Sequence, residues 1–585
     1  MENIAYSVID SKVIMRVRRR FCETPDELLQ SDLFRDLLRR CLKDLARRDS
    51  PLLAFLDGKH EQESTLDVLI QTLSFLTKIP LALVPNIVAG AASFPAHRKC
   101  MADFVEHLYN FWRSFERYAV CDSEGDGLDK RPYRTFNETV GNFSHLVRGV
   151  YRDVQEGIQG EHPRIYRQLN AGVEMSAIAL PQPIPLPAGP YEKLRGVSII
   201  RQVLLNPPLI LDPPMNKRTG SFILVSENPL ERVTVNTSDW LCYPARVGDL
   251  VILVYFHNTF FELGFSLCNL FELADDADLA RAPDAIYIFG DPTSGLDGIA
   301  EMPTVFAEDA ANGVFVAAVP NRREYGYFGY LKKMVLTLHN AIKMKQGRLP
   351  FHGALLSLQL KGGRGATVLL MGDTGAGKSE TIEALRGMAE SEIRELAIVA
   401  DDMGSLELRP DGVRAYGTEI GAFLRLDDLS PGFALGQIDR AIIMSAGRTN
   451  ARIVLPVTDY ASLVRGVKLD AVLYANNYEE VDADHPVLER FGTVTEALKV
   501  FRDGTSMSKG TTTATGLTHT YFANIFGPPQ YRSRHEELAG QFFQSFFESG
   551  TFVGQLRTRL GIAGKETEGP RQAARELLKL IAENR

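Results

Sequence analysis

A glycine-rich stretch, GDTGAGKSE at residues 372–380, constrains this chain more than any other part of its sequence. It follows the apolar run ATVLLM and precedes TIEALRGMAE, whose apolar spacing is typical of a helix. The stretch fits the pattern G-x-x-x-x-G-K-[ST], in which backbone N–H groups and a helix N-terminus face a polyphosphate. We therefore expect a phosphate-binding loop that consists of Gly372, Asp373, Thr374, Gly375, Ala376, Gly377, Lys378, Ser379 and Glu380.

Two side chains of this loop and two acids beyond it have expected roles. Lys378 would contact the outer phosphates, and the Ser379 hydroxyl would bind Mg²⁺. Downstream, ELAIVADDM predicts a buried strand that ends in Asp401 and Asp402. Phosphoryl transfer needs an acid there to hold a cation or its water shell, although solvated acids at a strand end are the ordinary alternative. Beside the phosphate loop, we favour the functional interpretation.

The composition narrows the class of protein. At 585 residues the chain is longer than a single core usually supports, so two or three domains are expected. Hydrophobic residues make up 45% and charged residues 24%, which is typical of a soluble globular protein. The net charge of -8 does not favour nucleic acid or an anionic membrane as a partner. We expect no nucleic-acid partner.

The absence of a recognisable targeting signal and the spacing of the cysteines both favour a cytoplasmic location. The first residues, MENIAYSVIDSK, do not resemble a signal peptide. The most apolar segment, residues 79–95, is interrupted by Pro85 and is too short to span a bilayer as a helix. The six cysteines show no C-x-x-C spacing, which favours a reduced setting. We expect a cytoplasmic protein with no membrane partner.

The pattern along the chain predicts an α/β protein (α+β overall) with three regions. Residues 1–180 have apolar side chains at helical spacing and are expected to be mostly helical. The proline-rich stretch LPQPIPLPAGP, residues 180–190, is the best linker candidate. Residues 191–325 read as a mixed α/β domain, and residues 326–585 as a catalytic domain that contains the phosphate loop and a helical tail.

Two motifs upstream of the loop acquire meaning from their order. They are YFGYLKK at residues 327–333 and LPFHGALLSL, which contains His352. Alone, the histidine would be an ordinary core residue and the lysine pair a solvated helix face. Together with GDTGAGKSE and VADDM, they follow the order of motifs in the phosphoenolpyruvate carboxykinases, which this chain resembles over residues 325–530. The chain resembles the HPr kinase/phosphorylases more remotely.

Later segments extend the resemblance. GTEIGAF with Glu419, NARIVLP and TYFANIFGPP are similar to segments that follow in the same order in the carboxykinases. The resemblance implies a carboxykinase-type P-loop nucleotide-binding domain in the C-terminal part of the chain. It also implies ATP or GTP as the nucleotide, with Mn²⁺ and Mg²⁺ as the cations.

The resemblance also assigns site residues. It implies that Lys333, His352 and Asp402 bind Mn²⁺, that Ser379 binds Mg²⁺, and that Tyr327 and Arg452 lie at the substrate site. A lysine binds a metal only as a neutral amine, so Lys333 would need a strongly lowered pKa. The expected catalytic residues are Lys333, Asp401, Asp402, Arg452 and Tyr327.

Some motifs depart from the carboxykinase pattern. The loop GDTGAGKSE is closer to the HPr kinase form than to G-L-S-G-T-G-K-T-T. The substrate segment R-S-P-K-D is absent, and the nearest basic segment is NKRTGSF with Arg218. The arginine of a late T-E-R-G segment is also missing, and Lys509 in SKGTTTATG is the available substitute.

Three functions therefore remain open. The first is a carboxykinase-like enzyme that couples phosphoryl transfer from a nucleotide to the decarboxylation of oxaloacetate, with a small dicarboxylic acid as its second ligand. The second is an HPr kinase-like enzyme that phosphorylates a protein or small-molecule hydroxyl, with one of the paired aspartates as the base. The third is a nucleotide-binding regulator without turnover.

Overall fold

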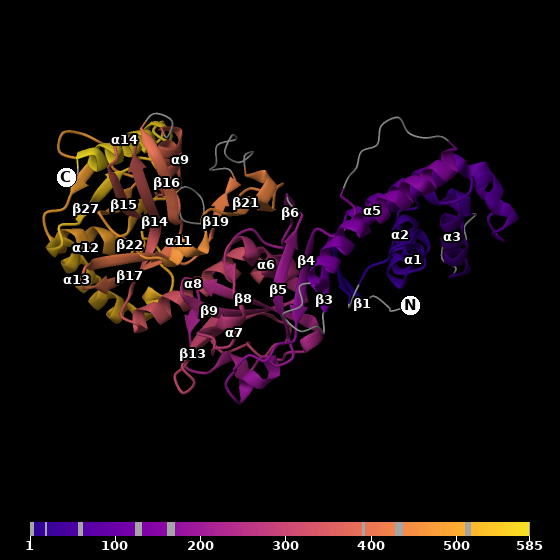
Figure 1. The fold of residues 1–585 in the computed structure, drawn as a ribbon, viewed down its shortest axis with the longest axis horizontal. Helices are drawn as coiled ribbons and strands as arrows, with labels where there is room; N and C mark the ends of the chain where they lie inside the picture. The colour runs from indigo at the N-terminus through magenta and orange to yellow at the C-terminus, as the bar shows by residue number, and fades with distance from the viewer. Residues whose placement is uncertain are drawn as a thin grey trace. The chain divides into compact units, whose positions relative to one another are not determined.

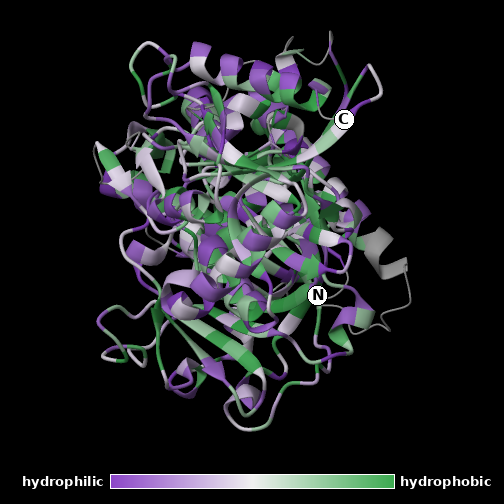
Figure 2. Ribbon diagram, turned by 90° about the vertical axis from the view of Figure 1, so that its left-hand side faces the viewer, coloured by the Kyte–Doolittle hydropathy of each residue, from purple (hydrophilic) through white to green (hydrophobic). Residues whose placement is uncertain are grey.

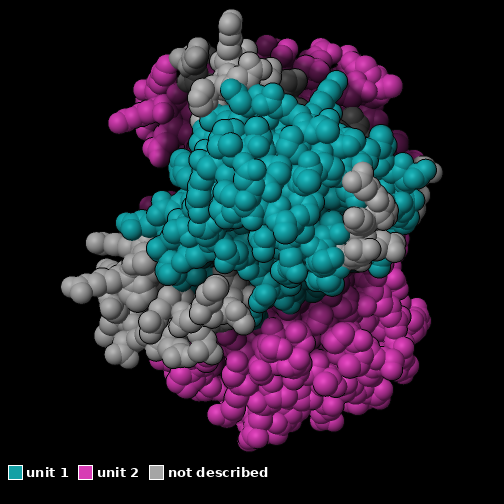
Figure 3. All heavy atoms as spheres, turned by 90° about the vertical axis from the view of Figure 1, so that its right-hand side faces the viewer, with its two compact units in different colours: residues 1–180, 200–206 teal, residues 181–199, 207–585 magenta. Residues whose placement is uncertain are grey.

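The computed structural model describes residues 5–17, 20–56, 63–122, 131–160, 170–206, 208–388, 392–426, 437–508 and 516–583. The chain divides into two compact units, which Figure 3 shows in different colours. Unit 1 contains Met1–Leu180 and Ile200–Asn206, and unit 2 contains Pro181–Ile199 and Pro207–Arg585. Residues 181–189 of the proline-rich stretch form no helix or strand, because proline restricts the backbone and lacks an N–H donor.

Unit 1 contains a small sheet in the order β1-β2-β3-β4. Strands β1 and β2 form an antiparallel hairpin, whereas β2, β3 and β4 run parallel. The strands are β1 (Ala5–Ile9), β2 (Lys12–Val17), β3 (Glu116–Asp122) and β4 (Met175–Leu180). The sequence pattern did not predict these strands. Strand β4, for example, is buried at every residue, and a fully buried strand lacks the period of two that would identify it.

The helices of unit 1 surround two hydrophobic clusters, one among the helices and one against the sheet (Figure 1). Helix α2 begins after Ser31, whose Oγ accepts a hydrogen bond from Phe34 N at 3.2 Å and caps the helix. The helices are α1 (Pro25–Leu29), α2 (Asp32–Arg47), α3 (Glu63–Leu76), α4 (Arg98–Arg113) and α5 (Arg131–Gln159), with short 3₁₀ helices η1 (Pro51–Leu56), η2 (Leu81–Asn86) and η3 (Phe94–His97).

A buried arginine ties the sheet of unit 1 to the segment that leads into β4. Arg117 on β3 is only 1% exposed. Its Nε donates to Gly172 O at 2.7 Å, and its Nη2 contacts Glu174 Oε1 at 2.8 Å. Another guanidinium nitrogen donates to Arg113 O at 3.0 Å. Burial lowers the pKa of Arg117, and the Glu174 carboxylate opposes that effect.

We expect Arg117→Ala to lower the free energy of unfolding of unit 1 by about 3–5 kcal/mol, because it leaves the half-buried Glu174 carboxylate and several carbonyls without their donor. Denaturant unfolding measured by circular dichroism would test this value. The control is Arg47→Ala, since the Arg47 side chain is 77% exposed in its ion pair and should contribute less than about 0.5 kcal/mol. Equal effects of the two substitutions would contradict the assigned role of Arg117.

The first sheet of unit 2 contains the middle part of the chain. Its order is β5-β8-β9-β11-β13-β12-β7, and β10 pairs with β8. Strands β8 and β9 form an antiparallel hairpin, and β9, β11 and β13 run parallel. The strands are β5 (Ser198–Leu205), β7 (Ile223–Leu224), β8 (Trp240–Val247), β9 (Leu250–His257), β10 (Glu272–Leu273), β11 (Ala285–Asp291), β12 (Val305–Asp309) and β13 (Val314–Pro320). The first two residues of β5 belong to unit 2.

The second sheet of unit 2 contains the phosphate-loop strand. Its order is β22-β18-β17-β14-β15-β23-β27-β24, and β16 also pairs with β14. The strands are β14 (Leu349–Leu360), β15 (Gly365–Met371), β16 (Ile393–Ala400), β17 (Met403–Arg409), β18 (Gly412–Gly417), β22 (Val467–Lys468), β23 (Ala471–Asn476), β24 (Leu488–Arg490) and β27 (Phe552–Arg557). Strand β14 is central because its first residues pair with β17 and its later ones with β15 and β16.

Two smaller sheets complete the strands of unit 2. One has the order β19-β21-β20-β6, and the other is the pair β25-β26. Their bounds are β6 (Leu209–Leu211), β19 (Gly421–Arg425), β20 (Ile442–Met444), β21 (Arg452–Pro456), β25 (Thr505–Met507) and β26 (Leu517–His519). Because β6 precedes the middle part of the chain and β20 follows the loop, this sheet joins distant parts of the sequence.

The helices of unit 2 are α6 (Phe261–Ser266), α7 (Asp276–Leu279), α8 (Phe328–Lys345), α9 (Lys378–Met388), α11 (Tyr460–Val464), α12 (Val494–Asp503), α13 (Arg532–Glu548) and α14 (Glu568–Glu583). Short 3₁₀ helices are η4 (Pro190–Leu194), η5 (Pro229–Glu231), η6 (Thr237–Asp239), η7 (Asn258–Phe260), η8 (Leu267–Asn269), η9 (Arg323–Tyr325), η11 (Ile438–Arg440) and η12 (Pro528–Tyr531). Helices α9 and α14 contact each other and the sheet of β14 and β15 (Figure 1).

Helix α8 is buried on almost all sides because it contacts strands of both large sheets of unit 2. On one side it meets β11 and β13, and on the other it meets β14 and β17. A helix in such a position must be apolar all round, so any charged side chain on it needs a partner. Its first two turns contain Lys332 and Lys333, which are therefore fixed by the packing of the whole unit.

The structure confirms the mixed α/β class. The strands expected at ATVLLM and ELAIVADDM are β15 and β16, and the expected helical tail is α13 and α14. Figure 2 shows hydrophobic colour along strands in the interior and alternating colours on outer helices. The six cysteines, all among the described residues, form no disulfide bond. In the part of the chain that the structure describes, we find no helix with the length and apolar character needed to cross a membrane.

Candidate active site at the phosphate-binding loop

The loop between β15 and α9 has the backbone shape that its glycines allow. Gly375 has φ 80° and Gly377 has φ 92°, in the left-handed region that favours glycine. A Cβ at Gly377 would also lie 2.5 Å from Thr558 Oγ1. Asn477 Nδ2 donates to Gly375 O at 2.8 Å, and Thr558 Oγ1 donates to Ala376 O at 2.7 Å. Residues that follow β23 and β27 therefore hold the loop in place.

Lys378 and Ser379 lie in the first turn of α9, as the motif predicts. Lys378 is 8% exposed, and its Nζ donates to Gly372 O at 2.6 Å and to Asp373 O at 3.0 Å. The ammonium is thus bonded to the carbonyls of its own loop. A phosphate group that binds here must replace those bonds with stronger ones to charged oxygens.

A pocket of about 110 Å³ lies beside the loop. It is smaller than the roughly 300–1,000 Å³ typical of sites for whole ligands, and it suits a phosphoryl-sized group. The pocket brings the loop together with both acids and with the arginine of β21. Its lining includes Thr374, Gly375, Lys378, Ser379, Glu380, Asp401, Asp402 and Arg452, with Arg386 and Arg425, which the sequence did not single out.

Asp402 and His352 are in direct contact. Asp402 follows β16, His352 lies on β14, and the two chain segments are joined by a hydrogen bond from Gly353 N to Asp402 O at 2.9 Å. His352 Nε2 lies 2.8 Å from Asp402 Oδ1, while His352 Nδ1 contacts Ala523 O. Because a carbonyl can only accept, Nδ1 must carry a hydrogen, and the Nε2 lone pair then faces a carboxylate. This arrangement requires a proton or a metal cation between Nε2 and Asp402.

Lys332, rather than its neighbour Lys333, forms the ion pair with Asp402. Its Nζ lies 2.7 Å from Asp402 Oδ2 and 3.0 Å from Glu419 Oε1, and the residue is 2% exposed. Burial opposes the charge on Lys332, but the two carboxylates outweigh burial and raise its pKa. Burial also opposes ionisation of Asp402, yet Lys332 and His352 hold the pKa of Asp402 well below its usual range.

The negative charges of the two other acids of the site are less well balanced by positive groups. Burial, reinforced by the neighbouring Asp402 charge, raises the pKa of Asp401. Burial also raises the pKa of Glu419, which is 3% exposed. The sequence singled out Glu419 only as part of a family-like segment, and its pairing with Lys332 depends on the contact between β18, β19 and α8.

Lys333 lies beside the Asp402 group without joining it. Its Nζ is 4.6 Å from the ring centre of Phe526, and no ion pair of Lys333 with a carboxylate occurs among the residues that the structure describes. Burial and the nearby guanidinium of Arg218 lower the pKa of Lys333 to about 8. That shift is in the direction that metal binding by a lysine requires.

Arg218 shares the Phe526 ring with Lys333. Its Cζ lies 5.5 Å from the centre of the Phe526 ring and 5.1 Å from that of Phe222. Asn216 and Asn450 bring its segment to the NARIVLP segment, since Asn450 Nδ2 donates to Asn216 O at 2.5 Å. Tertiary contacts thus place Arg218 near the site although its sequence spacing differs from the family pattern. Lys509, the other candidate basic residue, lies outside the described residues.

Phe423 on β19 connects the remaining predicted residues. The Arg452 Cζ lies 5.3 Å from the centre of its ring, and the Tyr327 ring centre lies 6.1 Å away. Lys332 Nζ is 5.8 Å from the same ring. The buried Arg452 Nε has no hydrogen-bond partner among the described residues, so it can bind an anionic ligand. Tyr327 is 6% exposed and borders the site through Phe423 rather than lining the pocket.

The backbone that faces His352 is strained. Phe522, Ala523 and Asn524 have φ values of 44°, 59° and 61°, which cost non-glycine residues about 1–3 kcal/mol each. This run directs Ala523 O at His352, and Asn340 Nδ2 fixes the following segment by donating to Phe526 O at 2.8 Å. Strain that is maintained by surrounding contacts often marks a functional site.

The residues present fit a divalent cation through a mixed donor set. His352 and Asp402 offer one nitrogen and one carboxylate, and Lys333, whose pKa is lowered, lies against the same Phe526 ring as His352. Among the described residues, no group of three or more His, Cys, Asp and Glu side chains could hold a metal ion. A cation here would therefore depend on the lysine as well.

Neither a scan against protein-family models nor a search of curated proteins finds a match to this chain.

We expect Lys378→Ala to abolish nucleotide binding, because it removes the ammonium that would contact the outer phosphates. Equilibrium titration with a fluorescent nucleotide would measure the loss. The control is Lys468→Ala, at an exposed lysine of the same unit, which should leave the affinity unchanged. A folded Lys378→Ala protein with unaltered nucleotide affinity would contradict the assignment of the loop.

The two neighbouring lysines should behave differently. Lys332→Met leaves the buried Glu419 carboxylate and the half-buried Asp402 carboxylate without their ammonium, so we expect it to lower the free energy of unfolding by about 3–5 kcal/mol. Lys333→Met removes a group that forms no ion pair, so we expect a change of less than about 1 kcal/mol. Denaturant unfolding followed by circular dichroism would compare them. A larger loss of stability in Lys333→Met than in Lys332→Met would mean that Lys333 is the structural partner of Asp402.

Proposed function

We propose that this protein is a carboxykinase-type enzyme, which transfers a phosphoryl group between a nucleotide, ATP or GTP, and the enolate formed when oxaloacetate loses CO₂. The supporting observation is the contact between His352 Nε2 and Asp402 Oδ1 at 2.8 Å beside the phosphate loop. Transfer to an ordinary hydroxyl needs a loop, a cation and a base, but it does not need a histidine held in this way. The proposal includes a carboxykinase-type arrangement of the phosphate-loop domain.

In the proposed reaction the bond between the oxaloacetate carbon chain and one carboxylate breaks, and CO₂ leaves. The electron pair passes to the carbonyl oxygen, which becomes an enolate oxygen. This oxygen attacks the terminal phosphorus, while the bond to the bridging oxygen of the nucleotide breaks. The products are phosphoenolpyruvate, CO₂ and a nucleoside diphosphate, so the contribution of the protein is mainly positioning and neutralisation of charge.

Each residue of the site would have a separate role in this reaction. Lys378 would exchange its bonds to loop carbonyls for bonds to phosphate oxygens. Arg452, whose Nε lacks a partner among the described residues, would fork onto a carboxylate of the acid. Lys332 stays bonded to Asp402 and Glu419 and keeps Asp402 ionised.

His352, Asp402 and Lys333 are the residues that would hold Mn²⁺, and Ser379 is the hydroxyl that would hold Mg²⁺ with the nucleotide. Bound cations would supply neutralisation of the negative charge on the reacting oxygens. The chain prepares for this by fixing His352 Nδ1 on Ala523 O, which leaves Nε2 as the ligand atom. It also lowers the pKa of Lys333 through burial and Arg218.

One observation favours a second candidate function, which is a kinase acting on a hydroxyl. Asp401 lines the pocket together with Lys378 and Ser379, where a general base for an acceptor hydroxyl would lie. The amino-acid sequence of the loop, GDTGAGKSE, is also closer to the HPr kinase form. In this alternative the histidine and the unpaired lysine would have no assigned role.

An assay with oxaloacetate, Mn²⁺ and ATP, GTP or pyrophosphate as the donor tests the proposal, with phosphoenolpyruvate as the measured product. We expect Arg452→Lys to reduce kcat/KM for oxaloacetate by about 100-fold, since it keeps the charge but loses the planar fork. The dissociation constant of the nucleotide should stay nearly unchanged. The matched control is Arg490→Lys, at an exposed arginine of the same unit.

No phosphoenolpyruvate from folded, metal-loaded protein with any of the three donors would contradict the carboxykinase proposal. Phosphate transferred instead to a hydroxyl of a protein or small molecule, and lost in Asp401→Asn, would support the kinase. Nucleotide binding without any transfer would support a regulator.

A further inference from the structure

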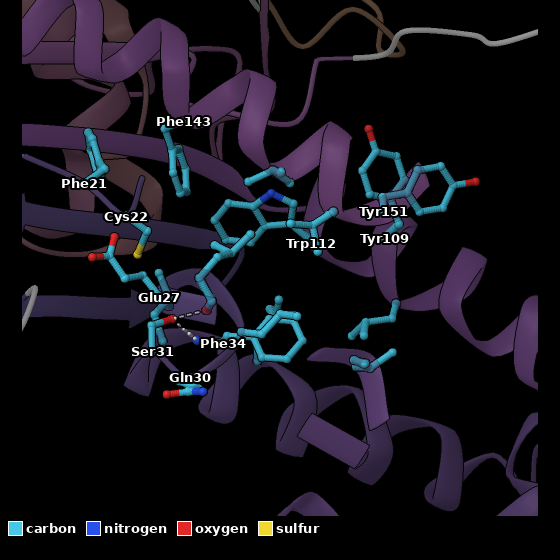
Figure 4. A pocket seen from close by; sticks show the side chains of 18 of the residues that line it. Phe21, Cys22, Glu27, Gln30, Ser31, Phe34, Tyr109, Trp112, Phe143 and Tyr151 are labelled. Carbon is cyan, nitrogen blue, oxygen red and sulfur yellow. Dashed lines mark hydrogen bonds between the residues drawn. The ribbon is translucent and has the colours of Figure 1, made fainter. Parts of the chain in front are cut away.

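A second pocket lies entirely within unit 1, which the proposed reaction does not use. Its volume is about 620 Å³, within the roughly 300–1,000 Å³ typical of small-molecule sites. It is bounded by β2, the segment before α1, and helices α1 to α5 (Figure 4). Its side chains come from both hydrophobic clusters of the unit, so the pocket lies where the helical cluster and the sheet cluster meet.

Aromatic rings form much of the wall. Phe21 and Phe143 stack with ring centres 4.9 Å apart, and Tyr109 and Tyr151 stack at 4.1 Å. Trp112 lies between these two pairs in Figure 4. Leucine and valine side chains from the helices fill the spaces between the rings. Aromatic and aliphatic groups of this kind favour a ligand with a large apolar body.

Three polar groups that border the cavity already have partners within the unit. Trp112 Nε1 donates to Ala171 O at 2.7 Å, and the Tyr151 hydroxyl donates to Glu106. Ser31 Oγ donates to Leu28 O at 2.8 Å and accepts from the backbone of α2. A polar ligand group placed among them would lose its water without gaining a partner, which is unfavourable. The interior therefore selects an apolar group.

Among the described residues at the edge of the pocket, the charges have a negative balance. Arg20 is the cation among these lining residues, and its guanidinium contacts Glu23 at 2.8 Å and Glu27 at 3.5 Å. Glu27 also lines the pocket, as does the exposed Asp32. One cation is thus shared by two carboxylates, and a third carboxylate lies nearby. An anionic head group would be repelled here, whereas an uncharged or cationic one would not.

We propose that unit 1 binds a mainly apolar small molecule, an alkyl chain or ring system, whose polar end is uncharged or cationic. The apolar body lies among the rings of Phe21, Trp112 and Phe143, and the polar end lies at the edge beside Glu27. Filling the cavity restores dispersion contacts that its apolar walls otherwise lack. An acid of the fatty-acid type is disfavoured by the carboxylates at that edge.

The chain supplies its own reporter for a test. It has two tryptophans, of which Trp112 lines this pocket and Trp240 is buried in unit 2. In full-length Trp240→Phe protein, the fluorescence of Trp112 can be titrated with 1-decanol, decyltrimethylammonium and decanoate below their aggregation concentrations. We expect saturable changes with the first two probes and at least ten-fold weaker binding of decanoate. No saturable change with any probe, or tightest binding of decanoate, would overturn the proposal.

Two variants locate the site. Val147→Phe adds a ring inside the pocket and should weaken 1-decanol binding at least ten-fold, whereas Leu83→Phe adds one at a 49% exposed position outside it and should not. Glu27→Gln keeps a side-chain oxygen for the backbone N–H of Glu23 but removes a negative charge. Glu27→Gln should narrow the difference in binding affinity between decanoate and decyltrimethylammonium. This test remains valid if Val147→Phe does not fold. Unchanged affinity of Val147→Phe for 1-decanol would overturn the assigned site. So would an unchanged difference in affinity between decanoate and decyltrimethylammonium in Glu27→Gln.

Discussion

The half-buried carboxylate of Asp402 is the constraint on which the candidate active site depends. An ionised carboxylate in this position is costly unless positive partners surround it. Lys332 on α8 supplies a positive partner for one carboxylate oxygen and also contacts Glu419, while His352 Nε2 on β14 contacts the other oxygen. One charge therefore fixes the relative positions of a helix and of strands from two sheets of unit 2. The phosphate loop, which follows the strand paired with β14, is positioned by the same framework.

The neighbouring lysines of α8 illustrate how packing separates two similar side chains. Successive residues of a helix point about 100° apart. Lys332 points to the carboxylates, whereas Lys333 points to the Phe526 ring and to Arg218. The first has its charge stabilised, and the second has its charge opposed. A buried helix between two sheets therefore creates one structural ammonium and one amine with a lowered pKa.

The two units present different chemistry. The pocket beside the loop in unit 2 is small and lined by acids and arginines, which suits transfer of a charged group. The pocket in unit 1 is larger and its wall is largely aromatic and aliphatic, which suits an apolar molecule. No residue lines both pockets. The apolar site is therefore a separate property of the chain, and the proposed chemistry does not depend on it.

The sequence by itself determined the phosphate loop, its flanking strand and helix, and the strand that ends in Asp401 and Asp402, because these are local patterns with a fixed geometry. It did not reveal the strands of unit 1; β4, for example, is buried at every residue, and a fully buried strand lacks an alternating pattern. Only the tertiary structure decided that Lys332 pairs with Asp402, that Arg218 lies beside Lys333, and that Phe423 joins Tyr327 to Arg452. These contacts link segments far apart in the chain, and their partners follow from the packing of α8 and the sheets rather than from local spacing.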